Sequence, residues 1–169
     1  ALPRHAAAPL TLVVEKSTAT LRVMADGREL KAFPVAFGPE PVGAKSREGD
    51  GRTPEGRYLL IPHHESPGFG ECFFVCYPNE ADAARGLSAG ALTRARARAT
   101  VAANARGSRP PQDTALGGLI LLHGTRDRSR TGLTTSNWTN GCIAMENADL
   151  VELLSAFDPG DRPVIDLRP

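Results

Sequence analysis

The chain has 169 residues, of which 41% are hydrophobic, and a formal net charge of +1 at pH 7, values typical of one globular domain. So small a net charge argues against nucleic acid as the main partner, because neutralising phosphates needs a concentrated basic face. The sequence has no run of about 18 apolar residues, so no transmembrane segment is predicted.

Residues 1–9 are interpreted as an N-terminal tail, and residues 10–169 as a single domain. The tail lacks an initiator Met and an apolar core long enough for a signal peptide, which is typical of a processed end. We therefore expect the fold to be built from residue 10 onward.

Three runs at the start of the domain predict antiparallel strands. Residues 10–16 and 20–25 are rich in apolar and β-branched side chains, and Asp26-Gly27 then favours a hairpin turn into residues 28–37. Pro34 in the third run indicates an edge strand, where a missing N–H does no harm. Residues 38–56 follow as a long Gly- and Pro-rich loop, and loops of this length are often functional.

Two further strands are predicted over residues 57–62 and 72–77. Cys72 and Cys76 would share one face of the second strand about 13 Å apart, which is too far for a disulfide. Because the chain has three cysteines, at least one thiol is free, and Cys142 is the candidate. Cys72 and Cys76 are interpreted as buried apolar residues.

The pair His63-His64 resembles part of a metal site. However, adjacent strand residues point to opposite faces, and no carboxylate or Cys recurs nearby at ligand spacing. We therefore predict no metal site there.

Residues 79–113 are rich in Ala and Arg, and residues 92–104 predict a helix with few large apolar residues on one face. A second helix is predicted after Cys142, with Asn147 as its N-cap. Its apolar residues at helical spacing are Leu150, Leu153, Leu154 and Phe157. Residues 162–167 then predict a closing strand. Many short strands and only two helices indicate a mainly β domain, either two packed sheets or an irregular barrel.

The chemistry of the chain centres on His123 and Cys142, which is 19 residues further on. A thiol is a nucleophile only as the thiolate, so it needs a neighbouring base or a positive field, and His is the usual base. His123 follows residues 118–122, an apolar run that predicts a buried strand and hence a rigid support. The alternative is a structural His and a small buried thiol without a catalytic role.

The residues before Cys142 predict a site for a negatively charged oxygen. Asn140-Gly141 favours a tight turn in which successive backbone N–H groups point the same way. A tetrahedral oxyanion needs such a cluster of donors, so the N–H groups of Gly141, Asn140 and Cys142 are the oxyanion-hole candidates.

These motifs resemble a known family. His123-Gly124 followed by Thr139-Asn140-Gly141-Cys142-Ile143, together with Gly49-Asp50-Gly51-Arg52-Thr53-Pro54-Glu55-Gly56, is similar to the L,D-transpeptidase catalytic domain (YkuD-like) family. Two departures stand out, because Asn140 replaces the family's His and Ala144 replaces an Arg. The Trp138-to-Ala144 form is more similar to the YafK-type branch than to the branch typified by cross-link-forming enzymes.

The resemblance implies an irregular β fold and a cysteine enzyme that needs no cofactor and acts on peptidoglycan stem peptides. It assigns the nucleophile to Cys142, the general base to His123 and the carbonyl that orients the imidazole to Gly124. Because stem peptides carry carboxylates, Arg52 and Arg57 are candidate substrate-binding residues. The alternative is that both are ordinary solvated surface arginines. Thr139 and Trp138, beside the nucleophile, are two further candidates.

The resemblance also implies a location in the bacterial periplasm or cell envelope, and inhibition by carbapenem-type β-lactams. Compared with the family, residues 87–112 look like an insertion, either near the site and binding anionic wall polymer or forming a solvated surface helix. An amine acceptor would give transfer, whereas water would make the protein a hydrolase that cuts cross-links or protein-to-wall links. A non-catalytic wall-binding module is the third alternative. A papain-like peptidase is disfavoured, because its Cys usually precedes its His.

Overall fold

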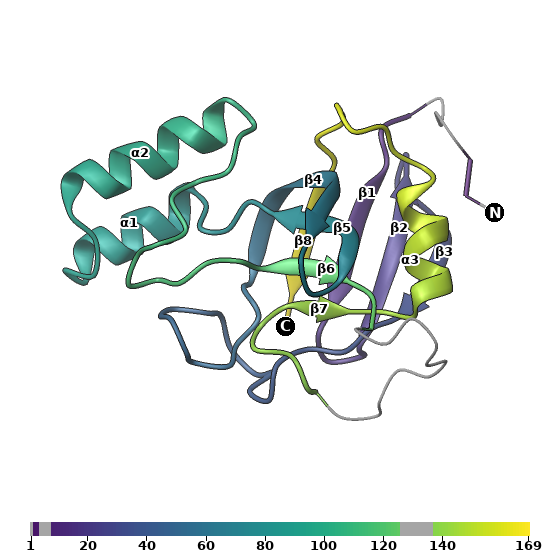
Figure 1. The fold of residues 1–169 in the computed structure, drawn as a ribbon, viewed down its shortest axis with the longest axis horizontal. Coiled ribbons are helices and arrows are strands. Elements are labelled where there is room, and N and C mark those ends of the chain that lie inside the picture. Colours follow the sequence, from purple (N-terminus) through teal and green to yellow (C-terminus); the bar gives the residue numbers. More distant parts are fainter. Residues whose placement is uncertain (1, 4–7, 126–136) are drawn as a thin grey trace.

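The computed structural model describes residues 2–3, 8–125 and 137–169 (Figure 1). The prediction of a mainly β domain with a few helices is confirmed, and the described residues form eight strands and three helices. The strands are β1 (Thr11–Glu15), β2 (Thr20–Ala25), β3 (Arg28–Pro34), β4 (Gly56–Ser66), β5 (Gly70–Val75), β6 (Leu121–His123), β7 (Ile143–Ala144) and β8 (Val164–Arg168). The helices are α1 (Glu80–Ser88), α2 (Arg94–Ala105) and α3 (Asn147–Leu154).

The eight strands form one sheet in the order β3-β2-β1-β8-β4-β5-β6-β7. The pairs β1–β8 and β6–β7 are parallel, and the other pairs are antiparallel. The long strand β4 belongs to both halves of the sheet, with a register shift between Ile61 and His64 that bends it. An isolated bridge between Ala36 and Ala144 brings the segment after β3 to β7, at the other end of the strand order. The sheet therefore curves back on itself.

The early strands were well predicted because they alternate apolar and polar residues. In β1 the buried residues are Leu12 and Val14, and in β2 they are Leu21 and Val23. These side chains lie in the main core, which also takes residues from β5, β8 and α3. β3 lies at the edge of the sheet, as Pro34 indicated.

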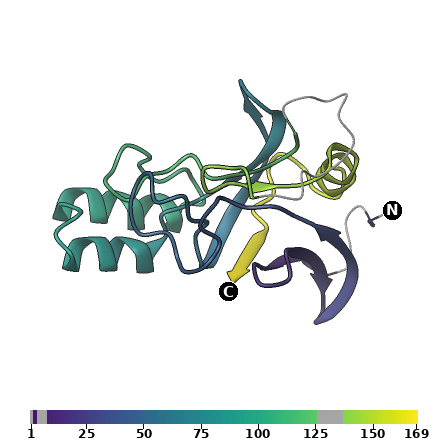
Figure 2. The same ribbon diagram turned by 90° about the horizontal axis from the view of Figure 1, so that it is seen from below.

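The helices lie at opposite ends of the molecule, with α1 and α2 side by side at one end and α3 at the other (Figures 1 and 2). Helix α2 confirms the predicted helix over residues 92–104, shifted slightly toward the C-terminus and capped by Thr93. Helix α1 was not predicted. It starts with a capping box in which Asn79 and Asp82 bond to each other's backbone N–H groups. None of the helices in the described ranges is long and apolar enough to cross a membrane.

Two local predictions were wrong. The strand expected over residues 118–122 is shorter, because only Leu121–His123 pairs, while Leu119 is 63% exposed with φ 55°. The N-cap of α3 is Glu146, and Asn147 is the first helical residue. Asp149 does lie in the first turn, and Leu150, Leu153 and Leu154 are buried as predicted. Of the predicted tail 1–9, only residues 2–3 and 8–9 are described, and Leu2 packs into the core.

Two buried lysines fix the loop that joins β3 to β4. The ammonium of Lys16 lies 2.7 Å from a carboxylate oxygen of Glu55 and donates to the carbonyl of Gly43 at 2.8 Å. Lys45 forms an ion pair with Asp50 at 2.9 Å, in which both side chains are less than a tenth exposed. The loop is thus held by charged groups where it has few apolar side chains to bury.

Asp50 is the centre of this loop. Its carboxylate accepts backbone N–H groups from Ser46, Arg47 and Arg52 in addition to the Lys45 ammonium. Burial alone would raise the pKa of Asp50, but these hydrogen bonds outweigh it and lower the pKa to about 2. The loop therefore requires an ionised carboxylate at this position.

We expect Asp50→Asn to lower the free energy of unfolding by roughly 2 kcal/mol at pH 6. Because the folded pKa of Asp50 is below its ordinary value, its contribution is complete above about pH 4 and is lost as the pH falls through about 2. The difference between wild type and variant, measured by urea unfolding, should therefore shrink from pH 6 to pH 2.5. A core variant, Ile165→Val, should show a difference that is independent of pH. An Asp50→Asn difference that is equally flat would contradict this assignment.

Candidate active site

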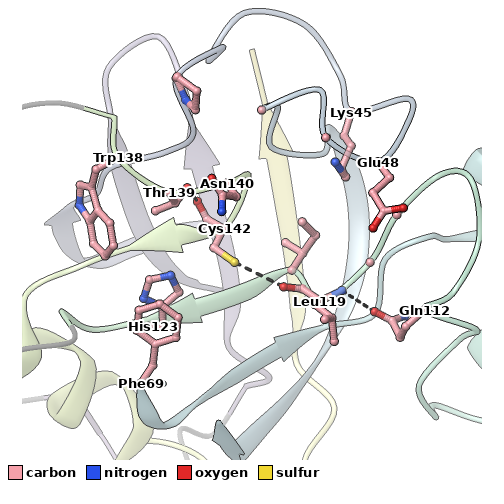
Figure 3. A pocket seen from close by; sticks show the side chains of 16 residues that line it. Lys45, Glu48, Phe69, Gln112, Leu119, His123, Trp138, Thr139, Asn140 and Cys142 are labelled. Carbon is pink, nitrogen blue, oxygen red and sulfur yellow. Dashed lines mark hydrogen bonds between the residues drawn. The ribbon is translucent and has the colours of Figure 1, made fainter. Parts of the chain in front are cut away.

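A pocket of about 840 Å³ lies where the loop after β3, the segment before β6 and the turn before β7 meet (Figure 3). Most of its walls come from segments outside the strands, so the sheet supports the pocket and the loops shape it. The side chains that matter for its chemistry are Lys45, Glu48, Phe69, Gln112, His123, Trp138, Thr139, Asn140 and Cys142.

His123 and Cys142 reach this pocket from the end of one strand and from the residue just before the neighbouring strand. His123 ends β6, and Cys142 immediately precedes β7, which pairs in parallel with β6. The Cys142 thiol donates to the carbonyl of Leu119 at 3.4 Å and accepts the N–H of Leu121 at 3.3 Å. The hydrogen bonds of the thiol to the described residues therefore go to the backbone before and within β6, and the imidazole lies in the same pocket.

The Cys142 thiol is protonated at neutral pH. Burial raises its pKa above the ordinary value, and the Leu121 N–H and the positive charge of Lys45 offset only part of this effect. A base must therefore take the proton when the sulfur attacks. Burial also raises the pKa of Cys72 to about 12 and that of Cys76 to about 11, and neither residue lines the pocket. All three thiols are free, and Cys72 and Cys76 are buried as predicted.

The imidazole of His123 is 1% exposed and is held on three sides. Its Nδ1 lies 2.6 Å from the carbonyl of Gly124, the group expected to orient it. The ring stacks on Phe69 at a centroid distance of 3.7 Å and meets Trp138 edge-on at 5.7 Å. When Nδ1 carries the hydrogen that it donates to Gly124, Nε2 is the basic nitrogen. Phe69, from the β4–β5 turn, was not predicted to be at the site.

Asn147, wrongly predicted as a helix cap, holds the backbone that follows His123. Its Oδ1 accepts the N–H of Thr125 at 3.0 Å, and its Nδ2 donates to the Thr125 hydroxyl at 2.7 Å. A Cβ at Gly124 would lie 2.1 Å from Asn147 Oδ1, so only glycine leaves room for this contact. Gly124 therefore has two roles: its carbonyl orients the imidazole of His123, and its lack of a side chain leaves room for Asn147.

The turn before Cys142 is fixed by Thr139, which is 5% exposed. The Thr139 hydroxyl donates to the carbonyl of Cys142 at 2.7 Å and accepts the Gly141 N–H at 3.2 Å. The backbone N–H groups of Asn140 and Cys142 make no hydrogen bond within the described ranges of the chain. Of the three oxyanion-hole candidates, these two have their donors available, whereas the Gly141 N–H is engaged inside the turn.

The structure does not bring Arg52 or Arg57 into the lining of this pocket. Arg57 is exposed on β4 and lines a separate hollow beside α1 and α2, and Arg52 lies with its guanidinium against Gly43. Their role in substrate binding stays a prediction. The cation that does line the pocket is Lys45, which the sequence did not single out because nothing marks it within a long loop.

His63 and His64 are used in packing and hydrogen bonding. His63 Nδ1 lies 2.5 Å from Glu71, and its Nε2 lies 2.8 Å from the carbonyl of Phe157. His64 meets Phe74 edge-on. In the part of the chain that the structure describes, no three His, Cys, Asp or Glu side chains gather as a possible metal site.

We expect Gly141→Ala to destabilise the protein by about 2–4 kcal/mol, because Gly141 has φ 120° and a Cβ there would lie 2.6 Å from the carbonyl oxygen of Arg52. Gly160→Ala is the matched control, since no atom lies within 4 Å of its added Cβ. The control should change stability by less than about 0.5 kcal/mol. Urea unfolding measures both, and equal effects of the two substitutions would contradict the close approach of the two segments.

Several solved structures share this fold. Pgp2 of Campylobacter jejuni, described as a helical cell shape determining protein, is 22% identical with a TM-score of 0.63, over 94% of this chain and 47% of Pgp2. Bd1075 of Bdellovibrio bacteriovorus is 19% identical with a TM-score of 0.58, over 94% and 47%. L,D-transpeptidase 1 of Mycobacterium tuberculosis is 12% identical with a TM-score of 0.51, over 96% and 62%.

The chain thus spans about half the length of Pgp2 and Bd1075. No curated protein matches the sequence. The family model of the L,D-transpeptidase catalytic domain, YkuD, matches residues 9–165, and the chain therefore belongs to the YkuD family of L,D-transpeptidase catalytic domains.

Proposed function

We propose that this protein is a peptidoglycan-modifying cysteine L,D-transpeptidase that forms a thioacyl enzyme on a stem peptide through Cys142. The observation that carries the proposal is the pocket in which a half-buried thiol, an imidazole fixed through Nδ1 and two available backbone N–H groups meet, in a chain of this family. A stem peptide lies in the cell envelope, so the proposal includes export of the protein to the periplasm or cell envelope.

In the first half of the reaction, Nε2 of His123 takes the proton of the Cys142 thiol as the sulfur attacks the peptide carbonyl. The carbonyl oxygen becomes an oxyanion, which the N–H groups of Cys142 and Asn140 stabilise by about 3 kcal/mol per donor. The thiol first leaves its hydrogen bond to Leu119, so its side chain turns toward the imidazole. Collapse of the intermediate breaks the peptide bond, and the imidazolium returns the proton to the departing amine.

In the second half, an acceptor attacks the thioester and regenerates the thiol. An amine acceptor gives transfer, which is the first candidate. Water is the second candidate, and it would make the protein a hydrolase that cuts cross-links or protein-to-wall links. The Trp138-Thr139-Asn140-Gly141-Cys142 form supports the YafK-type branch, and the similarity to Pgp2 supports a role in cell shape.

The test of the proposal is incubation with purified muropeptides followed by mass spectrometry. We expect a product that has lost its terminal residue, together with a mass gain from the amine in transfer or from water in hydrolysis. Imipenem is the second probe, because a related transpeptidase was solved with it. It should form one adduct with the wild type and with Cys76→Ala, and none with Cys142→Ala. An adduct on folded Cys142→Ala, or no change in any muropeptide, would refute the proposal.

We expect His123→Ala to slow acylation at pH 7 by about 10²–10⁴-fold, the usual effect of removing a general base. The thiol pKa is raised, so in the variant the acylation rate should keep rising with pH as the thiolate forms. The gap between wild type and variant should therefore narrow at alkaline pH, as measured by stopped-flow acylation with imipenem from pH 6 to pH 10. A gap that is constant across this range would show that the imidazole does not take the thiol proton.

A further inference from the structure

One wall of the pocket carries charged groups that the proposed reaction has not used. Lys45 and Glu48 stand on one side of Cys142, and Trp138 on the other (Figure 3). Of the described residues that line the pocket, Lys45 is the only lysine or arginine. Its side chain is only 3% exposed. Because burying an ammonium costs free energy, hydrogen-bond partners must compensate the Lys45 charge.

The ammonium of Lys45 is held in place by two hydrogen bonds, fewer than its three N–H donors could make. It donates to Asp50 Oδ1 at 2.9 Å and to the carbonyl of Arg47 at 3.0 Å, and an ammonium has three donors. Asp50 divides its negative charge between Lys45 and three backbone N–H groups of the loop. One N–H of Lys45 therefore remains for a ligand in the pocket.

Lys45 also lines the same pocket as Cys142, which is where a carboxylate next to the scissile bond would lie. The positive charge of Lys45 acts on the Cys142 thiol and lowers its pKa, partly offsetting the effect of burial. The carboxylate of a residue just beyond the scissile bond lies about one residue length, ~3.5 Å, past the attacked carbonyl. Glu48 is exposed on the same wall, so solvent screens its repulsion, whereas Lys45 acts from a buried position.

We propose that Lys45 is the binding residue for the free α-carboxylate of the terminal residue that acyl transfer releases. The proposal rests on the proposed function and adds the group of the substrate that the pocket selects. The protein would then act on the last peptide bond of a stem peptide, because only a terminal residue has a free α-carboxylate that can bind the ammonium. Loss of a charged hydrogen bond of this kind reduces binding by about 10- to 100-fold.

The experiment uses two synthetic stem peptides that differ only in ending with a carboxylate or a carboxamide. The measurement is kcat/KM for release of the terminal residue, by liquid chromatography and mass spectrometry. Wild type should prefer the carboxylate by about 10- to 100-fold. Lys45→Met should bring the ratio near one by losing activity on the carboxylate alone, and Lys45→Arg should keep part of the preference. Lys31→Met, a lysine on β3 paired with Glu152, is the control and should keep the full ratio.

The ratio separates binding from a structural role, since a damaged loop would slow both substrates alike and leave the ratio unchanged. If Lys45→Met does not fold, the double variant Lys45→Gln, Asp50→Asn, which removes both charges of the pair, undergoes the same measurement. A wild-type ratio near one, or a ratio that either variant preserves, overturns the proposal while the proposed function stands. A wild type that releases nothing from both peptides removes the proposed function, and this inference with it.

Discussion

The site depends on one backbone contact between two segments about 90 residues apart in the sequence. A Cβ at Gly141 would lie 2.6 Å from the carbonyl oxygen of Arg52, and one at Gly38 would lie 3.0 Å from the backbone nitrogen of Gly141. Glycines therefore let the loop after β3 reach the nucleophile turn main chain to main chain. Because of this contact, the loop can place Lys45 in the same pocket as Cys142.

The charged groups of the loop between β3 and β4 mainly determine the path of its backbone, and they contribute less to the stability of the fold. Two buried ion pairs, Lys16 with Glu55 and Lys45 with Asp50, hold a segment that has few apolar side chains. Taking such charges out of water costs about as much as their attraction returns, so a whole pair adds little net stability, whereas removing one partner alone leaves the other charge buried and unpaired and is destabilising. What they fix is geometry, since Asp50 also binds three backbone N–H groups and so determines the path of the loop. These contacts therefore hold the loop in one path beside the pocket.

The sequence predicted those parts of the fold and site that depend on neighbouring residues. Alternation identified β1 and β2, and the motif residues at 123 and 142 do share a pocket. Helix α1 was missed because its signal, the Asn79–Asp82 capping box, lies in an Ala- and Gly-rich stretch without an apolar stripe. Phe69, Lys45 and Gln112 were missed because they come from turns and loops that only the folding of the whole chain brings to the pocket. Of the predicted insertion 87–112, Gln112 is the described residue that reaches this pocket, and its amide holds Leu119 through a hydrogen bond to the N–H.

In the proposed acyl transfer, the groups around His123 and those around Cys142 have different roles. Phe69 stacks on the imidazole of His123 and Trp138 meets it edge-on, while the Gly124 carbonyl binds Nδ1, so the orientation of the ring is fixed. Burial raises the pKa of the Cys142 thiol, so the thiol is neutral at rest, and in the proposed reaction it loses its proton only as the sulfur attacks a carbonyl. The negative charge then develops on the carbonyl oxygen, and the N–H groups of Asn140 and Cys142 are the donors proposed to stabilise it. Because the pKa of the thiol is raised, little thiolate is present at neutral pH, and the resting thiol should react slowly with other electrophiles.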